Sequence, residues 1–211
     1  MIAARQIFFG RGGAKLPYDA EVEYLETEPK STGQKQYIDT LVASQTGLRA
    51  NVKFMWLSNS IGYDNYILAQ SGSTRFYLGT YQSKWMFGYN TYWQTEGIQE
   101  NIVYDADIAW YYGTPYLDID GSRLITGNQN IEITNNGTML LLSRQTNHAA
   151  FVAHARIYSC KLWQDNILVR DYIPVRFTNE LGQSEGAMYD RVSKQLFRNQ
   201  GTGAFLYGND K

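Results

Sequence analysis

Hydrophobic and polar residues alternate along most of the chain from Val22 onward. Because successive side chains of an extended strand point to opposite faces, a period of two predicts half-buried β-strands. No segment shows the 3.6-residue apolar stripe and the caps of an amphipathic helix, so we expect an all-β protein. The predicted strands cover residues 23–26, 36–41, 48–57, 66–70, 74–81, 84–89, 101–110, 116–120, 123–125, 130–134, 139–144, 151–164, 168–176 and 186–190.

Short polar dipeptides separate several of these strands. Asp120-Gly121 and Asn136-Gly137 supply residues that tolerate the left-handed conformation of a tight hairpin turn. Asp165-Asn166 lies between two apolar runs, so we expect those runs to pair as a hairpin. The strands are too many and too short for one sheet, and no fixed-period repeat indicates a propeller or solenoid. The sequence therefore predicts an all-β domain of two packed sheets over residues 21–211.

Composition excludes several classes of protein. Hydrophobic residues make up 44% of the 211 residues and charged residues 18%, which is typical of a folded globular domain. The net charge of −1 and the lack of a Lys/Arg stripe argue against a nucleic-acid partner. No apolar run approaches the ~20 residues of a membrane span. The single cysteine, Cys160, excludes an intrachain disulfide and is expected to be a small buried side chain.

Residues 1–20 form a separate N-terminal segment that we expect to act as an adapter or anchor. It contains the apolar residues Ile7, Phe8 and Phe9, followed by a glycine-rich stretch at 10–13. These three side chains are candidates for docking onto a partner, and the alternative is that they cover a sheet edge. The apolar run is too short for a signal peptide, so we expect synthesis in a cytoplasm. If the protein works outside a cell, lysis or another export route must release it.

Two pairs of aspartates each place two carboxylates on one face of a strand, Asp105 with Asp107 and Asp118 with Asp120. Some β-sandwich hydrolases cleave β-glucans with three carboxylates at alternate positions, but here the third carboxylate is missing, so glycoside hydrolysis is disfavoured.

The remaining reactive side chains do not form a catalytic set. His148 and His154 are the only histidines, and no nucleophile or third ligand accompanies them. Ser143 and Ser159 lack the context of a nucleophile elbow. We therefore expect no catalytic residues and no enzymatic activity.

The chain is rich in aromatic residues, with 17 Tyr and 5 Trp. Trp85, Phe87 and Tyr89 alternate on one strand and are expected in the core, whereas the aromatics just after them are expected in a loop. Consecutive aromatics at 110–112 cannot all point inward from one strand, so some rings must face solvent or a partner. Such rings suit sugar stacking, a protein interface or local packing. The candidate ligand-binding residues are Tyr92, Trp93, Trp110, Tyr111, Tyr112 and Tyr116.

Motifs near both ends of the chain resemble a known family. The first motif is Glu23-Tyr24-Leu25-Glu26 followed by Gln36-Tyr37-Ile38-Asp39-Thr40. The second begins at Arg156-Ile157-Tyr158, continues through Leu168-Val169-Arg170-Asp171-Tyr172-Ile173-Pro174-Val175 and Tyr189-Asp190, and closes on Phe197, Asn199 and Gly201-Thr202-Gly203. Together they resemble the concanavalin A-like (laminin-G-like jelly-roll) modules of phage and prophage proteins in gut bacteria. The resemblance covers roughly residues 22–208 and departs at the insertion 28–30 and in the aromatic-rich centre.

The resemblance implies a two-sheet antiparallel jelly-roll sandwich, and modules of this family often hold a calcium ion at the sandwich rim. Either aspartate pair could help to bind calcium, and Asp118 and Asp120 are the better candidates because Asp120-Gly121 is a rim turn. Calcium needs six to eight oxygens, and further ligands are not identifiable. No other cofactor is expected.

The resemblance also implies a non-catalytic virion accessory or adhesion protein, such as a capsid decoration, head-fibre or tail-associated module. Its implied partners are virion proteins, sister subunits and surface glycans of a bacterial host. The alternatives are a stand-alone bacterial carbohydrate-binding lectin, at the cell surface or secreted, and a glycoside hydrolase. Within the closing motif we expect structural roles: an ion pair for Arg170 or Asp171, a sheet edge or strand end for Pro174, and unusual backbone angles at Gly201 and Gly203.

Overall fold

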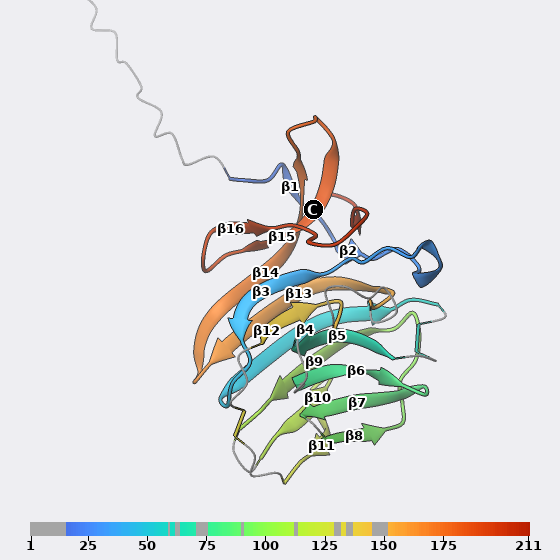
Figure 1. The fold of residues 1–211 in the computed structure, drawn as a ribbon, viewed down its shortest axis with the longest axis vertical. Coiled ribbons are helices and arrows are strands. Elements are labelled where there is room, and N and C mark those ends of the chain that lie inside the picture. Colours follow the sequence, from blue (N-terminus) through green and yellow to red (C-terminus); the bar gives the residue numbers. More distant parts are fainter. Residues whose placement is uncertain are drawn as a thin grey trace, which may run out of the picture.

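The computed structural model describes residues 16–58, 60–61, 64–70, 76–89, 91–111, 114–128, 132–133, 137–144 and 152–211. Two antiparallel sheets pack face to face as a sandwich, which confirms the predicted fold class (Figure 1). Among these residues the helical structure consists of one 3₁₀ turn, Lys30–Thr32. Within the same ranges, no helix has the length and hydropathy needed to cross a membrane.

The larger sheet has 11 strands and the smaller one has six. The main path of the larger sheet is β11 (Ser122–Thr126), β10 (Tyr116–Ile119), β9 (Val103–Ala109), β4 (Leu48–Trp56), β13 (Ala155–Gln164), β14 (Ile167–Thr178), β15 (Ser184–Asp190) and β16 (Gln195–Phe197). The short strands β1 (Ala20–Glu21), β2 (Leu25–Glu26) and β17 (Leu206–Tyr207) also pair with it. The smaller sheet runs β3 (Ile38–Ala43), β12 (Thr138–Leu141), β5 (Asn65–Gln70), β6 (Phe76–Tyr81), β7 (Lys84–Tyr89) and β8 (Thr91–Thr95).

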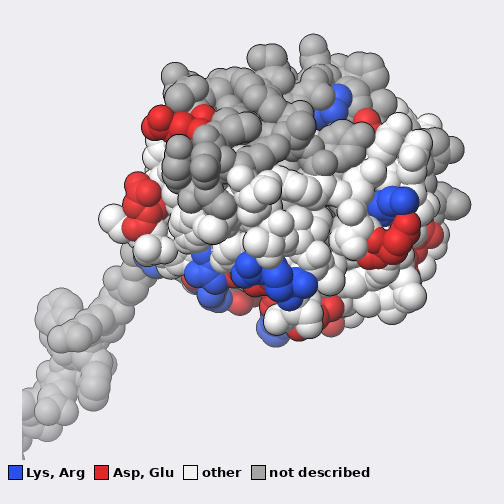
Figure 2. Space-filling model, turned by 90° about the horizontal axis from the view of Figure 1, so that it is seen from below, with Lys and Arg blue, Asp and Glu red and all other residues white. Residues whose placement is uncertain are grey.

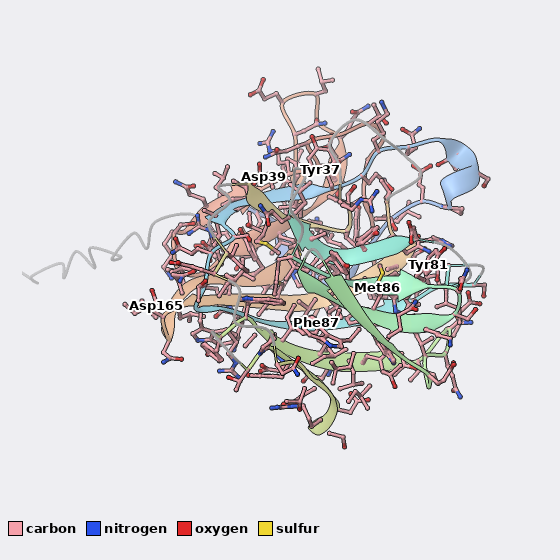
Figure 3. The ribbon with its side chains drawn as sticks, turned by 60° about the horizontal axis from the view of Figure 1, so that its bottom comes forward. Tyr37, Asp39, Tyr81, Met86, Phe87 and Asp165 are labelled. Carbon is pink, nitrogen blue, oxygen red and sulfur yellow. The ribbon has the colours of Figure 1, made fainter. Side chains whose placement is uncertain are left out.

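An aromatic core fills the space between the sheets. Phe54 and Trp56 of β4 are fully buried and meet edge to face, with ring centroids 5.5 Å apart. Burying rings of this size dominates the energetics of a core, and the edge-to-face geometry adds a favourable quadrupole interaction. Trp85 and Phe87 also belong to this core, as their alternation predicts, and the side chain of Tyr89 lies outside the described residues. Met86, between Trp85 and Phe87, points to the opposite face of the smaller sheet, where it joins a second buried cluster (Figure 3).

The hairpin turns predicted at Asp120-Gly121 and Asp165-Asn166 are confirmed, whereas Asn136 of the third predicted turn lies outside the described residues. Asp120 and Gly121 have φ values of 51° and 77°, and Asp165 and Asn166 have φ values of 50° and 65°. Two consecutive residues with positive φ are what a two-residue type I′ turn requires. These turns join β10 to β11 and β13 to β14.

Two predictions of secondary structure are wrong. Residues 91–95, where a loop is predicted for Tyr92 and Trp93, form strand β8, because pairing with β7 outweighs the irregular local pattern. Residues 132–133, which fall within a predicted strand, lie outside any strand. The short strands β1, β16 and β17 are additional to the predicted set. They are stabilised by tertiary pairing rather than by a clear pattern of their own.

The two ends of the described chain meet at one end of the molecule (Figure 1). β1 pairs with β14, and Val22 forms a bridge with Asp210. Arg176 donates two hydrogen bonds to the Asp210 carboxylate, of 2.6 and 2.7 Å. Ile7, Phe8 and Phe9, the predicted docking residues, lie outside the described residues.

The closing motif has the structural roles expected of it, with two corrections. The Nε atom of Arg170 lies 3.6 Å from Oδ2 of Asp190, which is its ion-pair partner. Gly203 has a φ of 74°, as expected, but Gly201 does not have a positive φ. Glycine is needed at 201 for a different reason, because a Cβ there would lie 1.3 Å from the carbonyl oxygen of Lys35. Pro174, predicted at an edge or strand end, lies inside β14. It pairs with Met188 of β15, and its carbonyl oxygen accepts the N–H of Val22 at 3.0 Å, so the predicted edge or end position is wrong.

Cys160 is fully buried, as predicted. Burial raises the pKa of its thiol far above the ordinary range, so the side chain is an inert part of the core.

Candidate functional site

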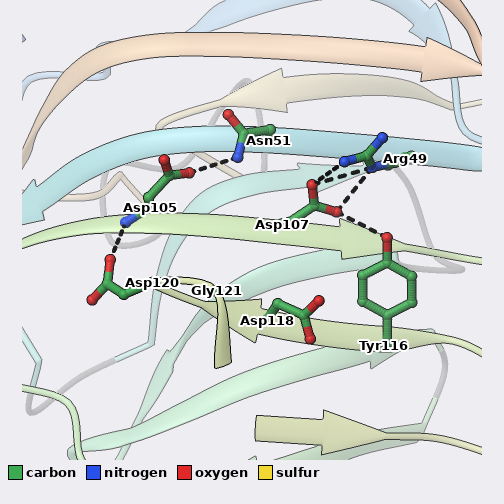
Figure 4. Close-up of a pocket in the computed structure, with 8 residues that line it drawn as sticks. All are labelled: Arg49, Asn51, Asp105, Asp107, Tyr116, Asp118, Asp120 and Gly121. Atoms are coloured by element: carbon green, nitrogen blue, oxygen red, sulfur yellow. Dashed lines mark hydrogen bonds and ion pairs between the residues drawn. The ribbon is translucent and has the colours of Figure 1, made fainter. Parts of the chain in front are cut away.

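A hollow of about 320 Å³ lies on the outward face of β4, β9 and β10 (Figure 4). The residues between its lining positions, such as Ala50, Ala106 and Leu117, are fully buried in the core. The period of two along each strand therefore sends the lining side chains to solvent. The lining consists of Arg49, Asn51, Asp105, Asp107, Tyr116, Asp118, Asp120 and Gly121.

Strand register brings these residues together from distant parts of the chain. Asn51 of β4 lies opposite Asp107 of β9, and Asp107 lies opposite Asp118 of β10. Directly opposite residues of an antiparallel pair have Cβ atoms about 5 Å apart, close enough for their side chains to interact. The site is thus built on three adjacent strands, two of which are central to the sheet.

Asp107 is the centre of the polar network. Arg49 Nε donates to both carboxylate oxygens of Asp107, at 3.0 and 3.1 Å, and Arg49 Nη2 donates to the second oxygen. The Tyr116 hydroxyl donates to Asp107 Oδ1 at 2.9 Å. Burial, together with the hydrogen bond to this carboxylate, raises the pKa of Tyr116 to about 12, so the hydroxyl stays protonated at neutral pH. The arrangement fixes one guanidinium, one carboxylate and one hydroxyl in defined positions.

A second set of contacts forms the other side of the hollow. Asn51 Nδ2 donates to Asp105 Oδ1 at 2.6 Å. The backbone N–H of Asp105 donates to Asp120 Oδ1 at 2.9 Å, and the N–H of Asp120 donates back to the carbonyl of Asp105 at 2.9 Å. The Asp120-Gly121 turn is therefore tied to β9 by both its side chain and its backbone.

Three half-buried aromatic rings border this polar network. The guanidinium of Arg49 lies 4.7 Å from the ring centroid of Trp163, and that of Arg123 lies 4.0 Å from the centroid of Tyr116. The rings of Tyr111 and Tyr116 are 6.4 Å apart. Fixed rings beside fixed hydrogen-bonding groups suit a ligand that has both an apolar face and several hydroxyl or amide groups.

The structure places the predicted ligand-binding residues in different parts of the molecule rather than in one site. Tyr116 lines the hollow, and Tyr111 lies beside it, with its ring centroid 6.4 Å from that of Tyr116. Trp110 has no exposed surface, so its predicted place in a binding surface is wrong: its ring packs in the core, 6.2 Å from Phe76. Trp93 is partly buried on the other sheet and stacks on Phe87, with centroids 6.0 Å apart. Tyr112 lies outside the described residues, as does the side chain of Tyr92.

Asp118 and Asp120, the predicted calcium ligands, both line the hollow. Arg123 binds Asp118 through Nε and through Nη2, the latter at 3.2 Å, while Asp120 accepts the backbone N–H of Asp105. Across the described part of the chain, no group of three or more His, Cys, Asp or Glu side chains is arranged to hold a metal ion. Two aspartates alone fall short of the six to eight oxygens that calcium takes.

Sequence reasoning missed Arg49, Asn51, Arg123 and Trp163. A weak signal exists for the first two, because polar residues alternate with small apolar ones through β4. Nothing in that pattern says that β4 lies beside β9, more than 50 residues later. Charged residues of both signs are intermixed on the face shown in Figure 2. No single-sign stripe marks a site among the described residues of that view.

Comparisons with known proteins support the fold. The sequence matches no protein-family model and no curated protein. Among solved structures, the chain is similar to a candidate carbohydrate-binding protein of Bacteroides ovatus, with a TM-score of 0.59 and 11% identity over 90% of this chain. The match covers 61% of that protein, so this chain spans less than two thirds of its length. An identity this low shows a shared β-sandwich fold only.

Two further similarities are partial. A double variant of human galectin-16 matches with a TM-score of 0.43 and 11% identity, covering 62% of this chain and 95% of the galectin. Tailspike protein 2 of the Escherichia coli bacteriophage CAB120 matches with a TM-score of 0.45 and 9% identity, covering 72% of this chain and 27% of the tailspike. Scores below 0.5 do not establish a shared fold.

Proposed function

We propose that this protein is a non-catalytic β-sandwich that binds glycans in the hollow on β4, β9 and β10. The observation that carries the proposal is the Arg49–Asp107 pair with the rings of Tyr116 and Trp163 at its border. A sugar ring presents an apolar C–H face that stacks on an aromatic ring, and its hydroxyls pair with charged groups in bidentate fashion. Aromatic rings and charged groups of both signs lie together on one sheet face, where paired strands hold their backbones in place.

The network also supports a binding role over a hydrolytic one. Asp107 accepts hydrogen bonds from Arg49 and Tyr116, and Asp118 accepts them from Arg123. Such carboxylates are oriented as fixed acceptors. Glycoside hydrolysis instead needs a protonated acid and a second carboxylate that reaches the reacting carbon or its water.

We further propose that the domain works on the surface of a virion, as an accessory or adhesion module. The motifs at both ends of the sequence support this setting. The position of the hollow is compatible with it, because β9, β10 and β11 lie at the opposite end of the sandwich from β1 and the C-terminus (Figure 1). A domain anchored through its N-terminal segment would present the hollow outward, and repeated display on one particle would turn weak contacts into strong adhesion.

A stand-alone bacterial lectin is the second candidate, since the same hollow would serve it. Gene neighbours distinguish the two candidates without a binding experiment. Capsid or tail genes beside this one would support the virion setting, and polysaccharide-utilisation genes would support the lectin.

The direct test of glycan binding is calorimetric titration of the full chain with five oligosaccharides: cellohexaose, xylohexaose, laminarihexaose, mannohexaose and N-acetyllactosamine. We expect saturable binding of at least one member of this panel. A glycan array extends the search to bacterial surface polysaccharides. Failure of every glycan to bind the folded wild-type protein would reject the proposed function.

A further inference from the structure

We propose that the side chain of Arg123 covers one face of the Tyr116 ring in the free protein, and that a glycan must displace this cover to stack on the ring. This inference rests on the proposed glycan-binding function and adds a residue that sets the affinity of the same site. The guanidinium of Arg123 lies over the Tyr116 ring, 4.0 Å from its centroid. It therefore occupies a ring face that a sugar would need.

The hairpin of β10 and β11 positions this cover. Arg123 lies opposite Asp118 in the strand register, and its guanidinium binds the Asp118 carboxylate. The turn at Asp120-Gly121 fixes that register because both residues have positive φ. Within this hairpin the Arg123 guanidinium thus contacts both the Tyr116 ring and the Asp118 carboxylate, and the Tyr116 hydroxyl donates a hydrogen bond to Asp107.

Arg123 is held more loosely than the other arginine of the site. Arg49 lies on the central strand β4, makes three hydrogen bonds to Asp107, and its side chain is 36% exposed. Arg123 lies on β11, which ends the path of the larger sheet, and its side chain is 47% exposed. An exposed ion pair and an exposed cation–π contact each favour the contacting position of a side chain over the displaced position by only about two- to fivefold. A bound sugar can therefore replace both contacts of Arg123.

Displacement of Arg123 frees the two groups that a sugar needs most. The Tyr116 ring face opens, and the oxygens of Asp118, which already lines the hollow, become acceptors for hydroxyl groups. In the free protein the binding-competent arrangement is only a fraction of the population, so the measured affinity is lowered by that fraction. Removing the arginine removes this penalty.

The test is titration of Arg123→Ala with the same five oligosaccharides. We expect affinity for the panel member that binds wild type best to rise by about three- to tenfold. Arg156→Ala is the matched control, because Arg156 also lies over a tyrosine, Tyr24, at 4.2 Å and pairs with a carboxylate, Glu26, but does not line the hollow. The affinity of Arg156→Ala for the same oligosaccharide should equal that of wild type. A gain that disappears in the double variant Arg123→Ala/Tyr116→Ala would show that the cover acts through the ring.

Weaker or unchanged binding by Arg123→Ala would overturn the inference. Weaker binding would make Arg123 a direct ligand contact, and unchanged binding would make it a surface residue. Arg123→Gln, which keeps most of the aliphatic stem, gives the same comparison if the alanine variant does not fold. The proposed function fails separately, when neither wild type nor any arginine variant binds a member of the panel.

Discussion

Arg49→Ala is expected to weaken oligosaccharide binding by roughly 10- to 100-fold, the effect of losing a charged hydrogen-bond donor from a binding site. The variant loses the donor itself and the three bonds that orient Asp107. It also removes the cation that lies over Trp163. Calorimetric titration with the best-binding member of the five-oligosaccharide panel measures the change, and circular dichroism verifies that the sheet structure is retained.

Arg176→Ala is the matched control for this variant. Arg176 makes a comparable two-bond contact with Asp210, but at the end of the molecule where the chain termini meet. Its removal should leave oligosaccharide affinity unchanged. Equal affinities for Arg49→Ala and wild type would place the binding site elsewhere on the molecule.

Asp190→Ala is expected to cost about 3–5 kcal/mol in the free energy of unfolding, the effect of breaking a buried charged network. Asp190 is fully buried and accepts hydrogen bonds from the backbone N–H groups of Asp171, Val192 and Ser193 at 2.8–3.1 Å. Its loss leaves these donors without an acceptor and leaves Arg170 without its ion-pair partner. Denaturant unfolding followed by tryptophan fluorescence gives the difference, with Glu180→Gln, an exposed carboxylate in the β14–β15 turn, as the control.

The Asp190 carboxylate also makes the free energy of unfolding depend on pH. Burial by itself would raise the pKa of Asp190, but the hydrogen bonds from Asp171, Val192 and Ser193 outweigh it and hold the pKa below its usual value. Because the folded-state pKa is lowered, Asp190 stabilises the fold above the unfolded-state value of about 3.9, and this contribution is lost as pH falls further. Asp190→Asn should therefore lose less stability than wild type between neutral pH and pH values of about 3. An identical pH dependence in the two proteins would contradict this assignment.

Many of the strands and tight turns are predictable because side-chain alternation and turn residues, which act over only a few positions, specify them. The period of two in β4 and the positive-φ residues of the two tight turns act over a few residues, and their strands and hairpins form as expected. Strand β8 was missed because only its pairing with β7 makes it a strand. Tertiary context outweighs strand propensity in such cases.

The site is less predictable because it depends on register between distant strands. The sequence indicates that some aromatics at 110–112 must face outward, but register decides that Trp110 points into the core. Shifting a strand by one residue would exchange its two faces. The pairing of β4 with β9, which brings Arg49 to Asp107, joins segments separated by more than 50 residues. No local pattern specifies that pairing.

The most direct test of the central claim is amide chemical-shift mapping of the ¹⁵N-labelled full chain during titration with the oligosaccharide that binds it best. We predict that the largest shifts fall on Arg49, Asn51, Asp107, Tyr116 and Trp163, which lie on or beside the hollow. Shifts confined to the smaller sheet, or no shifts at saturating oligosaccharide, would contradict the claim that this sheet face binds glycans.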